Sequence, residues 1–323
     1  MTRREFITGL GAAAAVWRPR AAVAQQGRLP VVGVLRPNRK DILETFAEPF
    51  RRYMKAIGWE EGRNIGFLFA WTESRSERAA ALADELVGQN VDLIIAFGDQ
   101  ATRAAQRATR TIPIVAMTDD MIGSGLAASM ARPGGNTTGV SILASELNVK
   151  RLEILHEFVP QARRIAVLAD STTISSSAQL ASAARDLGVE LAPFDAQDPD
   201  ELSRALDAMA AARVEAANVL ASPLLNVSRL KIIDRMRDAR LPAIYQWPES
   251  AEDGGLLAYG PRNLLCYRHV VSLVDKVLRG AKPADLPIEQ PSKFELAVNL
   301  KTASALGMTI SPTLLLRADE VIE

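Results

Sequence analysis

Residues 92–102 read DLIIAFGDQAT, an apolar run that stops at a glycine and continues into polar residues. The run Asp92–Phe97 is rich in isoleucine and does not alternate with polar residues, which favours a strand buried on both faces. A helical pattern then begins within Gly98–Thr102. A buried strand that leads directly into a helix is the building unit of a parallel α/β sheet, so this stretch decides the class of fold.

The same unit recurs on both sides of this stretch. The predicted strands are the short apolar runs Pro30–Leu35, Asn64–Ala70, Asp92–Phe97, Pro113–Met117, Thr138–Ile142, Arg164–Ala169, Val189–Phe194, Ala216–Leu220, Ala243–Tyr245 and Gly255–Tyr259. Between them, stretches such as 43–54, 79–87 and 270–278 carry apolar residues at helical spacing. This alternation predicts an α/β fold built from doubly wound parallel sheets with helices on both faces.

Ten or so strands divide into two sheets of about five. We expect the division near Ser141–Leu147, where the predicted helix Glu146–Phe158 leads into a second series of strands and helices. No low-complexity linker separates the two lobes, which favours a hinge with a cleft between them. Open α/β sheets bind ligands beyond the carboxyl ends of their strands, so the residues that follow each predicted strand are the candidates for a site.

The N-terminal 24 residues have the order of an export signal. Arg3 and Arg4 come first, the short apolar stretch Gly9–Trp17 follows, and a small-x-small cleavage pattern ends at Ala24-Gln25. The apolar stretch is too short to cross a bilayer, which takes about 20 residues. Residues 1–24 are therefore predicted to be a twin-arginine-type signal, cleaved near Ala24-Gln25, that places the rest of the chain in a periplasm.

The charge balance excludes one class of partner. The 323-residue chain has 38 basic and 38 acidic residues, and removal of the predicted signal leaves a formal net charge of −3. Nucleic-acid binding favours a concentrated basic face, so we expect no nucleic-acid partner. The single cysteine, Cys266, excludes a disulfide within the chain and fits a small core residue.

One group of candidate ligand contacts lies at the start of a predicted helix. Gly98, Asp99 and Gln100 follow a buried strand, and the exposed amides of a helix N-terminus favour a ligand carboxylate. The side chain of Asp99 could instead pair with a ligand ammonium group, or simply cap the helix. Arg36, at another strand end, suits a carboxylate, and its alternative is a solvated loop arginine.

A second group follows the predicted strand that ends at Met117. Thr118, Asp119 and Asp120 could hold an amine or hydroxyl groups, or could cap the next helix. Trp71 stands at a further strand end, where its ring could serve as a platform for a ligand.

The most ligand-like stretch is Tyr245-Gln246-Trp247-Pro248-Glu249, because aromatic residues make up only 5% of the chain. Tyr245 and Trp247 could stack on a ring or a cation, with Gln246 and Glu249 as polar contacts. The alternative is packing over the end of the sheet. Tyr259, near the end of a later strand, is a further candidate.

In the second lobe, hydroxyl, carboxylate and amide side chains follow two predicted strands. Asp170, Ser171 and Thr172 end the first of them, and Ser222 and Asn226 follow the second. These side chains could bind polar groups of a ligand. Residues of the same kinds are also frequent at helix starts.

A rival function rests on Gly123-Ser124-Gly125, which opens a G-x-G-x-x-A pattern typical of nucleotide binding. It would make the chain an exported NAD(P)-dependent oxidoreductase. Five residues separate the predicted strand from Gly123, where the motif needs a tight turn, and the pattern is not in the first strand–helix unit. A second glycine pair, Gly134-Gly135, is predicted to form a turn with positive φ.

Other catalytic chemistry finds little support. His156 and His269 are the only histidines, and both fall within helical patterns. No Cys/His set could hold zinc, and no G-x-S-x-G elbow is present. We therefore expect no enzyme, no catalytic residues, no metal and no cofactor.

Five segments in order carry a resemblance to a known family. They are GWEEGRNI (58–65), TIPIV (111–115), ARPGGNTTGVSIL (131–143), GGLLAYGP (254–261) and the closing stretch 279–323 with its strand-like FELAVNL run. Together they resemble the substrate-binding proteins of ABC transporters, in the family that includes binders of tryptophan and other aromatic amino acids. The resemblance covers about residues 29–323.

The resemblance implies a type I periplasmic binding fold, in which two α/β lobes joined by three crossovers close on a small solute. It places the crossovers near 141–145, 259–262 and 287–290, so that lobe 1 takes residues 29–141 and 262–287 and lobe 2 takes 142–261 and 288–323. The implied partners are a small-molecule solute and an ABC permease in the inner membrane. We take a monomer as the default oligomeric state. A binding module that reports ligand closure to a receptor remains an alternative with the same fold.

Overall fold

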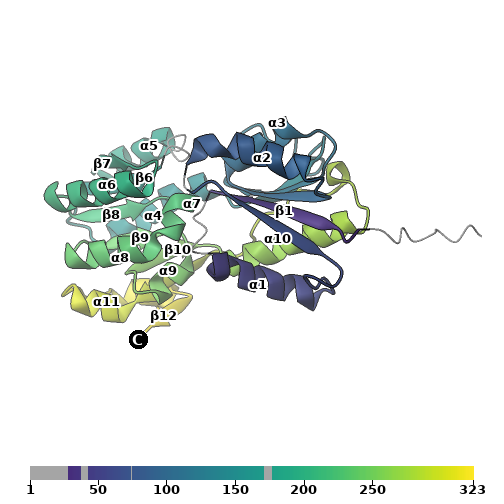
Figure 1. Ribbon diagram of the computed structural model, residues 1–323. Coiled ribbons are helices and arrows are strands. Elements are labelled where there is room, and N and C mark those ends of the chain that lie inside the picture. Colours follow the sequence, from purple (N-terminus) through teal and green to yellow (C-terminus); the bar gives the residue numbers. More distant parts are fainter. Residues whose placement is uncertain (1–27, 38–42, 74, 171–176) are drawn as a thin grey trace, which may run out of the picture.

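Two sheets, each covered by helices, make up the folded part of the chain. The computed structural model describes residues 28–37, 43–73, 75–170 and 177–323, so the predicted export signal lies outside the described residues. The two sheets with their helices lie side by side, and α7 lies where they meet (Figure 1). In the described part of the chain, no helix has both the length and the apolar character needed to cross a membrane.

The first sheet has five parallel strands in the order β2-β1-β3-β4-β5. Its strands are β1 (Val31–Arg36), β2 (Gly66–Trp71), β3 (Leu93–Phe97), β4 (Ile114–Thr118) and β5 (Thr137–Ser141). The helices that accompany it are α1 (Leu43–Ala56), α2 (Ala79–Gly88), α3 (Asp99–Ala108) and α10 (Asn263–Leu278), with short 3₁₀ turns at Ser76–Arg78 and Pro283–Asp285.

The second sheet has seven strands in the order β12-β11-β10-β9-β8-β6-β7. They are β6 (Arg164–Ala169), β7 (Glu190–Asp195), β8 (Ala216–Val219), β9 (Ala243–Tyr245), β10 (Leu257–Gly260), β11 (Glu295–Asn299) and β12 (Glu320–Ile322). Its helices are α4 (Ala144–Phe158), α5 (Ser177–Leu187), α6 (Pro199–Ala211), α7 (Pro223–Val227), α8 (Arg229–Asp238), α9 (Pro248–Glu252), α11 (Leu300–Ala305) and α12 (Pro312–Arg317).

The central strands are mainly apolar because both faces of each sheet are covered, whereas the edge strand β7 has exposed residues. In β3, Leu93, Ile95 and Phe97 belong to the core under α1 and α10, whereas Ile94 and Ala96 belong to the core under α2 and α3. Successive side chains of a strand point to opposite faces of the sheet. In β3 the side chains on both faces therefore pack against apolar partners. The helical stripes fit this arrangement, since Ala47, Phe50 and Met54 of α1 are fully buried.

The sheets differ in two respects from the sequence prediction. The second sheet has one strand that was not predicted, β12, which has three residues and is too short to show a pattern in the sequence. The strand-like FELAVNL run does form β11, but this strand runs antiparallel to β10 in a sheet that was predicted to be parallel. The direction of β11 has a topological reason. After β10 the chain leaves for α10 in the first lobe and returns to the same end of the second sheet, so the strand that re-enters must run the other way.

Helix α10 follows a strand of the second sheet but packs on the first. It contacts α1 and strands β3, β4 and β5, and its buried face includes Val270, Leu273 and Val274. The predicted core role of Cys266 is confirmed, because this residue is 1% exposed in the same helix. Helices α1 and α10 thus cover one face of the first sheet together (Figure 1).

The chain passes between the two sheets at three places. One lies between β5 and α4, and another between β10 and α10. At the third, the amide of Glu289 donates to the carbonyl of Gly139 and its carbonyl accepts from the amide of Ser141, both at 2.9 Å. The returning segment is therefore held along the edge of β5.

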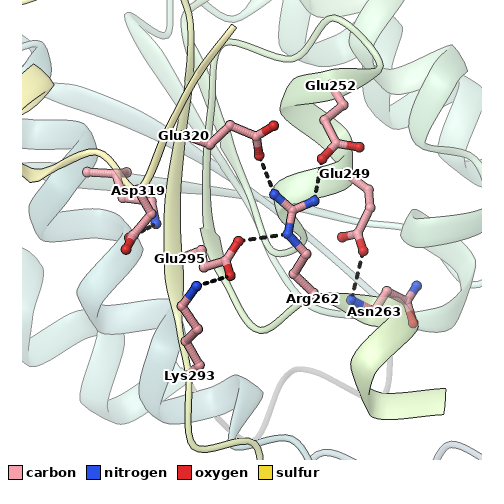
Figure 2. A network of polar contacts seen from close by, with 9 residues as sticks. Glu249, Glu252, Arg262, Asn263, Lys293, Glu295, Asp319 and Glu320 are labelled. Carbon is pink, nitrogen blue, oxygen red and sulfur yellow. Dashed lines mark hydrogen bonds and ion pairs between the residues drawn. The ribbon is translucent and has the colours of Figure 1, made fainter. Parts of the chain in front are cut away.

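A network of charged residues surrounds the start of α10. Figure 2 shows Arg262 between three carboxylates, with its Nε 2.7 Å from Glu295 and its two terminal nitrogens bonded to Glu252 and Glu320. Lys293 adds a second contact to Glu295 at 2.7 Å. Because the carboxylates belong to α9, β11 and β12, the network fixes the residue before α10 to the second sheet.

The pKa of Glu295 makes part of this network dependent on pH. Burial would raise the pKa of Glu295, but hydrogen bonds from Lys293 and Arg262 outweigh it and hold the pKa below its usual range. Such a carboxylate stabilises the fold above its unfolded pKa of about 4.3, and this stability is lost as the pH falls through the folded pKa.

We therefore expect Glu295→Gln to lower the free energy of unfolding by about 1 kcal/mol at pH 7, because one acceptor of the network is lost. As the pH falls below about 4.3 towards the lower folded pKa of Glu295, the difference from the unmodified protein should shrink, because the carboxyl is protonated first in the unfolded state and then in the folded state as well. Urea unfolding at pH 7, 5 and 3.5 measures this. Glu157→Gln, which alters a pair with Arg317 that is about 40% exposed, serves as a control with a difference near zero. A Glu295 effect that stays constant with pH would contradict the assignment.

Candidate functional site

A cavity of about 150 Å³ lies between the two sheets, at the carboxyl ends of their strands. It is lined from both sides, as the topology of open α/β sheets favours. The first lobe contributes residues that follow β1 to β5 and two from α10, and the second lobe contributes residues that follow β6 to β9. The site therefore depends on both lobes at once.

Arg36 lies at the end of β1 and is only 6% exposed. Its guanidinium carbon is 4.3 Å from the ring centroid of Phe97 and 5.9 Å from that of Tyr267. Nη2 of Arg36 also donates to the hydroxyl of Tyr267 at 3.5 Å. Burial lowers the pKa of Arg36, and Tyr267 acts in the opposite direction. Two aromatic rings thus hold a buried cation beside the cavity.

Gly98 and Asp99 form the turn from β3 into α3. Gly98 has φ +84°, a left-handed conformation that favours glycine, and it lets the chain turn at the cavity wall. The carboxylate of Asp99 accepts a hydrogen bond from the hydroxyl of Ser124. Burial raises the pKa of Asp99, and the Ser124 hydrogen bond opposes this shift. The neighbouring carboxylate of Asp119 raises the pKa further.

The end of β4 adds a hydroxyl group to this acidic wall. Thr118 is 2% exposed, and its Oγ1 has no hydrogen-bond partner among the described residues. Asp119 follows directly and also lines the cavity. A buried hydroxyl without a partner carries a free-energy cost, which a ligand in the cavity could remove.

Trp247 brings an aromatic ring from the second lobe. It follows β9, is 6% exposed, and belongs to the same hydrophobic cluster as Phe97 and Tyr267 of the first lobe. Its Nε1, like Nε2 of the neighbouring Gln246, has no hydrogen-bond partner among the described residues. The two lobes therefore share an apolar contact around the cavity that also contains unused donors.

The position of Gln246 depends on a close approach of two backbones. A Cβ at Gly260 would lie 2.1 Å from the carbonyl oxygen of Gln246, so only glycine allows β10 to end this close to the cavity loop. The remaining polar lining of the second lobe comes from Asp170, Gln197, Ser222 and Asn226. Of these, Asp170 is 5% exposed, and Ser222 also caps α7 by accepting from the amide of Leu225 at 3.0 Å.

The cavity brings together most of the positions expected from the sequence. The lining includes Arg36, Gly98, Asp99, Gln100, Thr118, Asp119, Asp170, Ser222, Asn226, Gln246 and Trp247. Ser171 and Thr172 lie outside the described residues. Ligand contact by the lining residues remains a prediction, because a wall position alone does not show which groups a ligand touches.

Two first-lobe candidates lie away from the cavity. Trp71 stacks on Phe69, with ring centroids 5.8 Å apart and planes at 11°, so its ring packs on β2. Asp120 accepts from the amides of Ile122 and Gly123 at 3.0 and 2.9 Å. It therefore stabilises the turn after β4. The helix that it was expected to cap is not present, since residues 121–128 form turns and bends.

Three second-lobe candidates also lie away from the cavity. Tyr245 is 3% exposed in the core under α6 and α8, because the last residue of β9 points to the opposite face from Gln246. Tyr259 packs partly buried against the other core of this sheet. Glu249 accepts from the amide of Asn263 at 3.0 Å (Figure 2), and burial raises the pKa of Glu249.

Several lining residues were not predicted. Phe97 ends β3, Ser124 lies in the loop after β4, and Asn263 and Tyr267 come from the first turns of α10. Phe97 could have been found, because a large aromatic residue ends a strand that points at the cleft. Tyr267 could not, since its place beside Arg36 depends on the passage of α10 to the first lobe.

The structure also shows the conformation of the two glycine motifs in the loop after β4. The residues that follow Gly123-Ser124-Gly125 form turns and not a helix. This arrangement lacks the helix N-terminus that the nucleotide fingerprint needs, so it does not support the oxidoreductase. Gly134 and Gly135 have φ values of +73° and +61°, which confirms the predicted turn.

Comparisons with known proteins agree on one family. The family model described as ABC transporter substrate binding protein matches residues 31–322. A curated protein named tyrosine-binding protein, from Clostridioides difficile, is 27% identical over 276 residues, which cover 82% of this chain and 77% of that protein.

Two solved structures show the same fold. A conserved domain protein from Vibrio cholerae is 24% identical with a TM-score of 0.82, and the match covers 91% of this chain and all of that one. An ABC domain from Streptococcus pneumonia, crystallised in complex with L-Trp, is 22% identical with a TM-score of 0.80 and the same coverage.

Proposed function

The chain belongs to the family of ABC transporter substrate binding proteins, and from this premise we propose that it captures a small organic solute between its two lobes. The solute class that we propose is an aromatic amino acid or a related acid or amine. The named ligands of the relatives, tyrosine in one case and L-Trp in the other, support this class.

The observation that carries the proposal is the cavity between the lobes. Phe97, Trp247 and Tyr267 give it apolar aromatic walls, while Arg36 and the carboxylates of the lining give it charged groups. Aromatic side chains bind planar apolar groups over a large area, and a few placed polar groups fix the orientation of a small ligand. A solute with an aromatic ring and a charged end fits both requirements.

We propose that the protein acts through a difference in ligand affinity between its open and closed forms. We propose that residues 29–141 and 262–287 move as one lobe against residues 142–261 and 288–323, about the three places where the chain crosses. A ligand that contacts both lobes only when they are closed shifts the population towards the closed form. A permease that recognises the closed surface then receives the solute, and no covalent chemistry is needed.

We infer the cellular location of the protein from its N-terminal segment. We propose that the signal at residues 1–24 directs export by the twin-arginine route, with cleavage near Ala24-Gln25, and that the protein acts as a periplasmic monomer beside an inner-membrane permease. Mass spectrometry of the protein isolated from a periplasmic fraction would identify the mature N-terminus. Retention of residues 1–24 in that fraction would contradict the cleavage site.

A thermal-shift screen tests the proposed function. The purified protein is heated with amino acids, aromatic acids, purines, polyamines and NAD(H) in separate wells. At a concentration about 100 times its dissociation constant, a ligand adds about 2.7 kcal/mol of stability, a shift of a few degrees for a protein of this size. A hit among aromatic solutes supports the proposal, whereas a hit with NAD(H) alone would replace it by the exported oxidoreductase.

A further inference from the structure

Several uncharged polar atoms of the cavity lining are buried without a hydrogen-bond partner among the described residues. They are Thr118 Oγ1, Gln246 Nε2, Trp247 Nε1 and Asn263 Oδ1. Gln246 and Trp247 are 5% and 6% exposed, so water does not replace the missing partners. Buried polar groups in folded proteins are nearly always paired. Unpaired groups in the wall of a binding cavity therefore indicate what a ligand supplies.

Three of these atoms belong to two loops that lie side by side. Gln246 and Trp247 follow β9, and Asn263 begins α10 shortly after β10. Because β9 and β10 are adjacent parallel strands, both loops leave the sheet at the same edge. The loops are in contact, since a Cβ at Gly260 would meet the carbonyl oxygen of Gln246. The amide of Asn263 also donates to Glu249, two residues beyond Trp247 (Figure 2). The three atoms thus occupy one part of the cavity wall.

The kinds of atom define the group that would pair them. Gln246 Nε2 and Trp247 Nε1 are donors, whereas Asn263 Oδ1 is an acceptor. A hydroxyl group accepts two hydrogen bonds and donates one, so a single hydroxyl can serve all three atoms. A carboxylate can serve both donors but has no proton for Asn263. An ammonium group can serve only the acceptor, and an unsubstituted ring serves none of the three.

The aromatic wall indicates where on the ligand this hydroxyl lies. The indole ring of Trp247 packs in one cluster with Phe97 and Tyr267 of the first lobe, and its N–H group lies on the edge of that ring. A ligand ring that packs against the same cluster brings its own edge close to the indole N–H. A hydroxyl attached directly to the ligand ring therefore fits this position.

On the basis of the function proposed above, we propose that the ligand carries a hydroxyl group on its aromatic ring, which accepts from Gln246 and Trp247 and donates to Asn263. The donors belong to the second lobe and the acceptor to α10 of the first, so the hydroxyl joins the two lobes. All three atoms are covered in this arrangement of the lobes, so the hydroxyl enters while the lobes are apart and is enclosed as they close. A ring without the hydroxyl leaves the three atoms buried and unpaired, which weakens its binding.

Four pairs of compounds that differ only in the ring hydroxyl test this preference. They are tyrosine and phenylalanine, tyramine and 2-phenylethylamine, 3-(4-hydroxyphenyl)propionate and 3-phenylpropionate, and 5-hydroxytryptophan and tryptophan. The two members of a pair have the same net charge at neutral pH, so charge does not affect their ratio. Isothermal titration calorimetry with the full chain gives each dissociation constant. In at least one pair we expect the hydroxylated member to bind at least about tenfold more tightly.

A fluorinated compound controls for filled space. The fluorine of 4-fluorophenylalanine occupies nearly the same position as the hydroxyl of tyrosine, but it has no proton and is a poor acceptor. We expect this compound to bind like phenylalanine. If it binds as tightly as tyrosine, the preference comes from filled space and the hydrogen bonds are wrong.

Variants connect the preference to its residues. Gln246→Met and Trp247→Phe each remove one donor and keep an apolar side chain, and Asn263→Leu removes the acceptor. Each should reduce the affinity ratio between the two members of a pair at least about threefold. Gln89→Met, at an exposed position after α2, should leave the ratio unchanged. Thermal unfolding curves without ligand establish that each variant is folded, and the three positions test the proposal independently.

The outcomes separate this inference from the proposed function. If compounds bind but no hydroxylated member binds tenfold more tightly than its partner, the hydroxyl preference is wrong while the proposed function stands. A preference that all three variants leave unchanged overturns the assigned position of the hydroxyl. If none of the compounds binds, the aromatic solute class of the proposed function is wrong, and this inference falls with it.

Discussion

Trp247→Ala is expected to weaken ligand binding by more than tenfold, or more than about 1.4 kcal/mol, while both sheets remain folded. The ring of Trp247 is 6% exposed and joins the aromatic cluster of the first lobe across the cavity. Removal of a large buried aromatic side chain costs about 3–5 kcal/mol when it lies in a core. Here the loss falls on the contact between the lobes, and therefore on the closed form that we propose to hold the ligand.

Trp71→Ala is the matched control for this prediction. It removes the same side chain from a buried position on β2 that does not line the cavity, so stability should fall and affinity should stay within about twofold. Trp247→Phe distinguishes the contribution of the aromatic ring to binding from that of the indole N–H group, because it keeps an aromatic face and removes the donor. Calorimetric titration with the ligand from the screen gives the affinities. Equal affinities for Trp247→Ala and the unmodified protein would remove the tryptophan from the site.

The second large effect is expected at Arg151, the largest side chain that is fully buried in the described part of the chain. Burial lowers the pKa of Arg151 to about 9. Its Nη1 donates to the carbonyl of Tyr259 at 3.0 Å, and its Nη2 donates to the side chain of Asn148. The residue thus joins α4, which follows the first crossing, to the end of β10, which precedes the second.

Arg151→Met should lower the free energy of unfolding by about 3–5 kcal/mol, because the acceptors on Tyr259 and Asn148 stay buried without their donor. Urea unfolding at pH 7 measures the loss. Lys150→Met, on the exposed side of the same helix, removes a surface pair with Glu153 and should cost less than about 1 kcal/mol. If Arg151→Met folds poorly, Arg151→Lys should lose stability in part, since it keeps the charge without the planar fork. A loss for Arg151→Met no larger than that for Lys150→Met would contradict the role.

The strand and helix pattern could be predicted from the sequence because it depends on local composition. Most strands from β1 to β10 show directly as apolar stretches, since parallel strands covered on both faces are built mainly from apolar residues. The prediction was incomplete where an element is very short, as in β12, or where direction depends on distant connections, as in β11.

The site was predicted where it depends on strand ends and missed where it depends on tertiary packing. Gln246 and Trp247 follow β9 and line the cavity, whereas Tyr245 points into the core because strand side chains alternate in direction. Tyr267 lies 231 residues from Arg36 in the sequence, yet the two side chains form a hydrogen bond. No local pattern marks such a pair, since it exists only after α10 crosses to the first lobe.

The buried thiol of Cys266 makes the protein suitable for use as an optical sensor. It is the single cysteine of the chain, and burial raises its pKa to about 12, with the charge of Glu249 adding to the shift. A thiol that stays protonated and covered reacts slowly with maleimide dyes. A second cysteine introduced at the exposed rim of the cavity could then be labelled selectively, and the fluorescence of its dye would report the presence of the solute in real time.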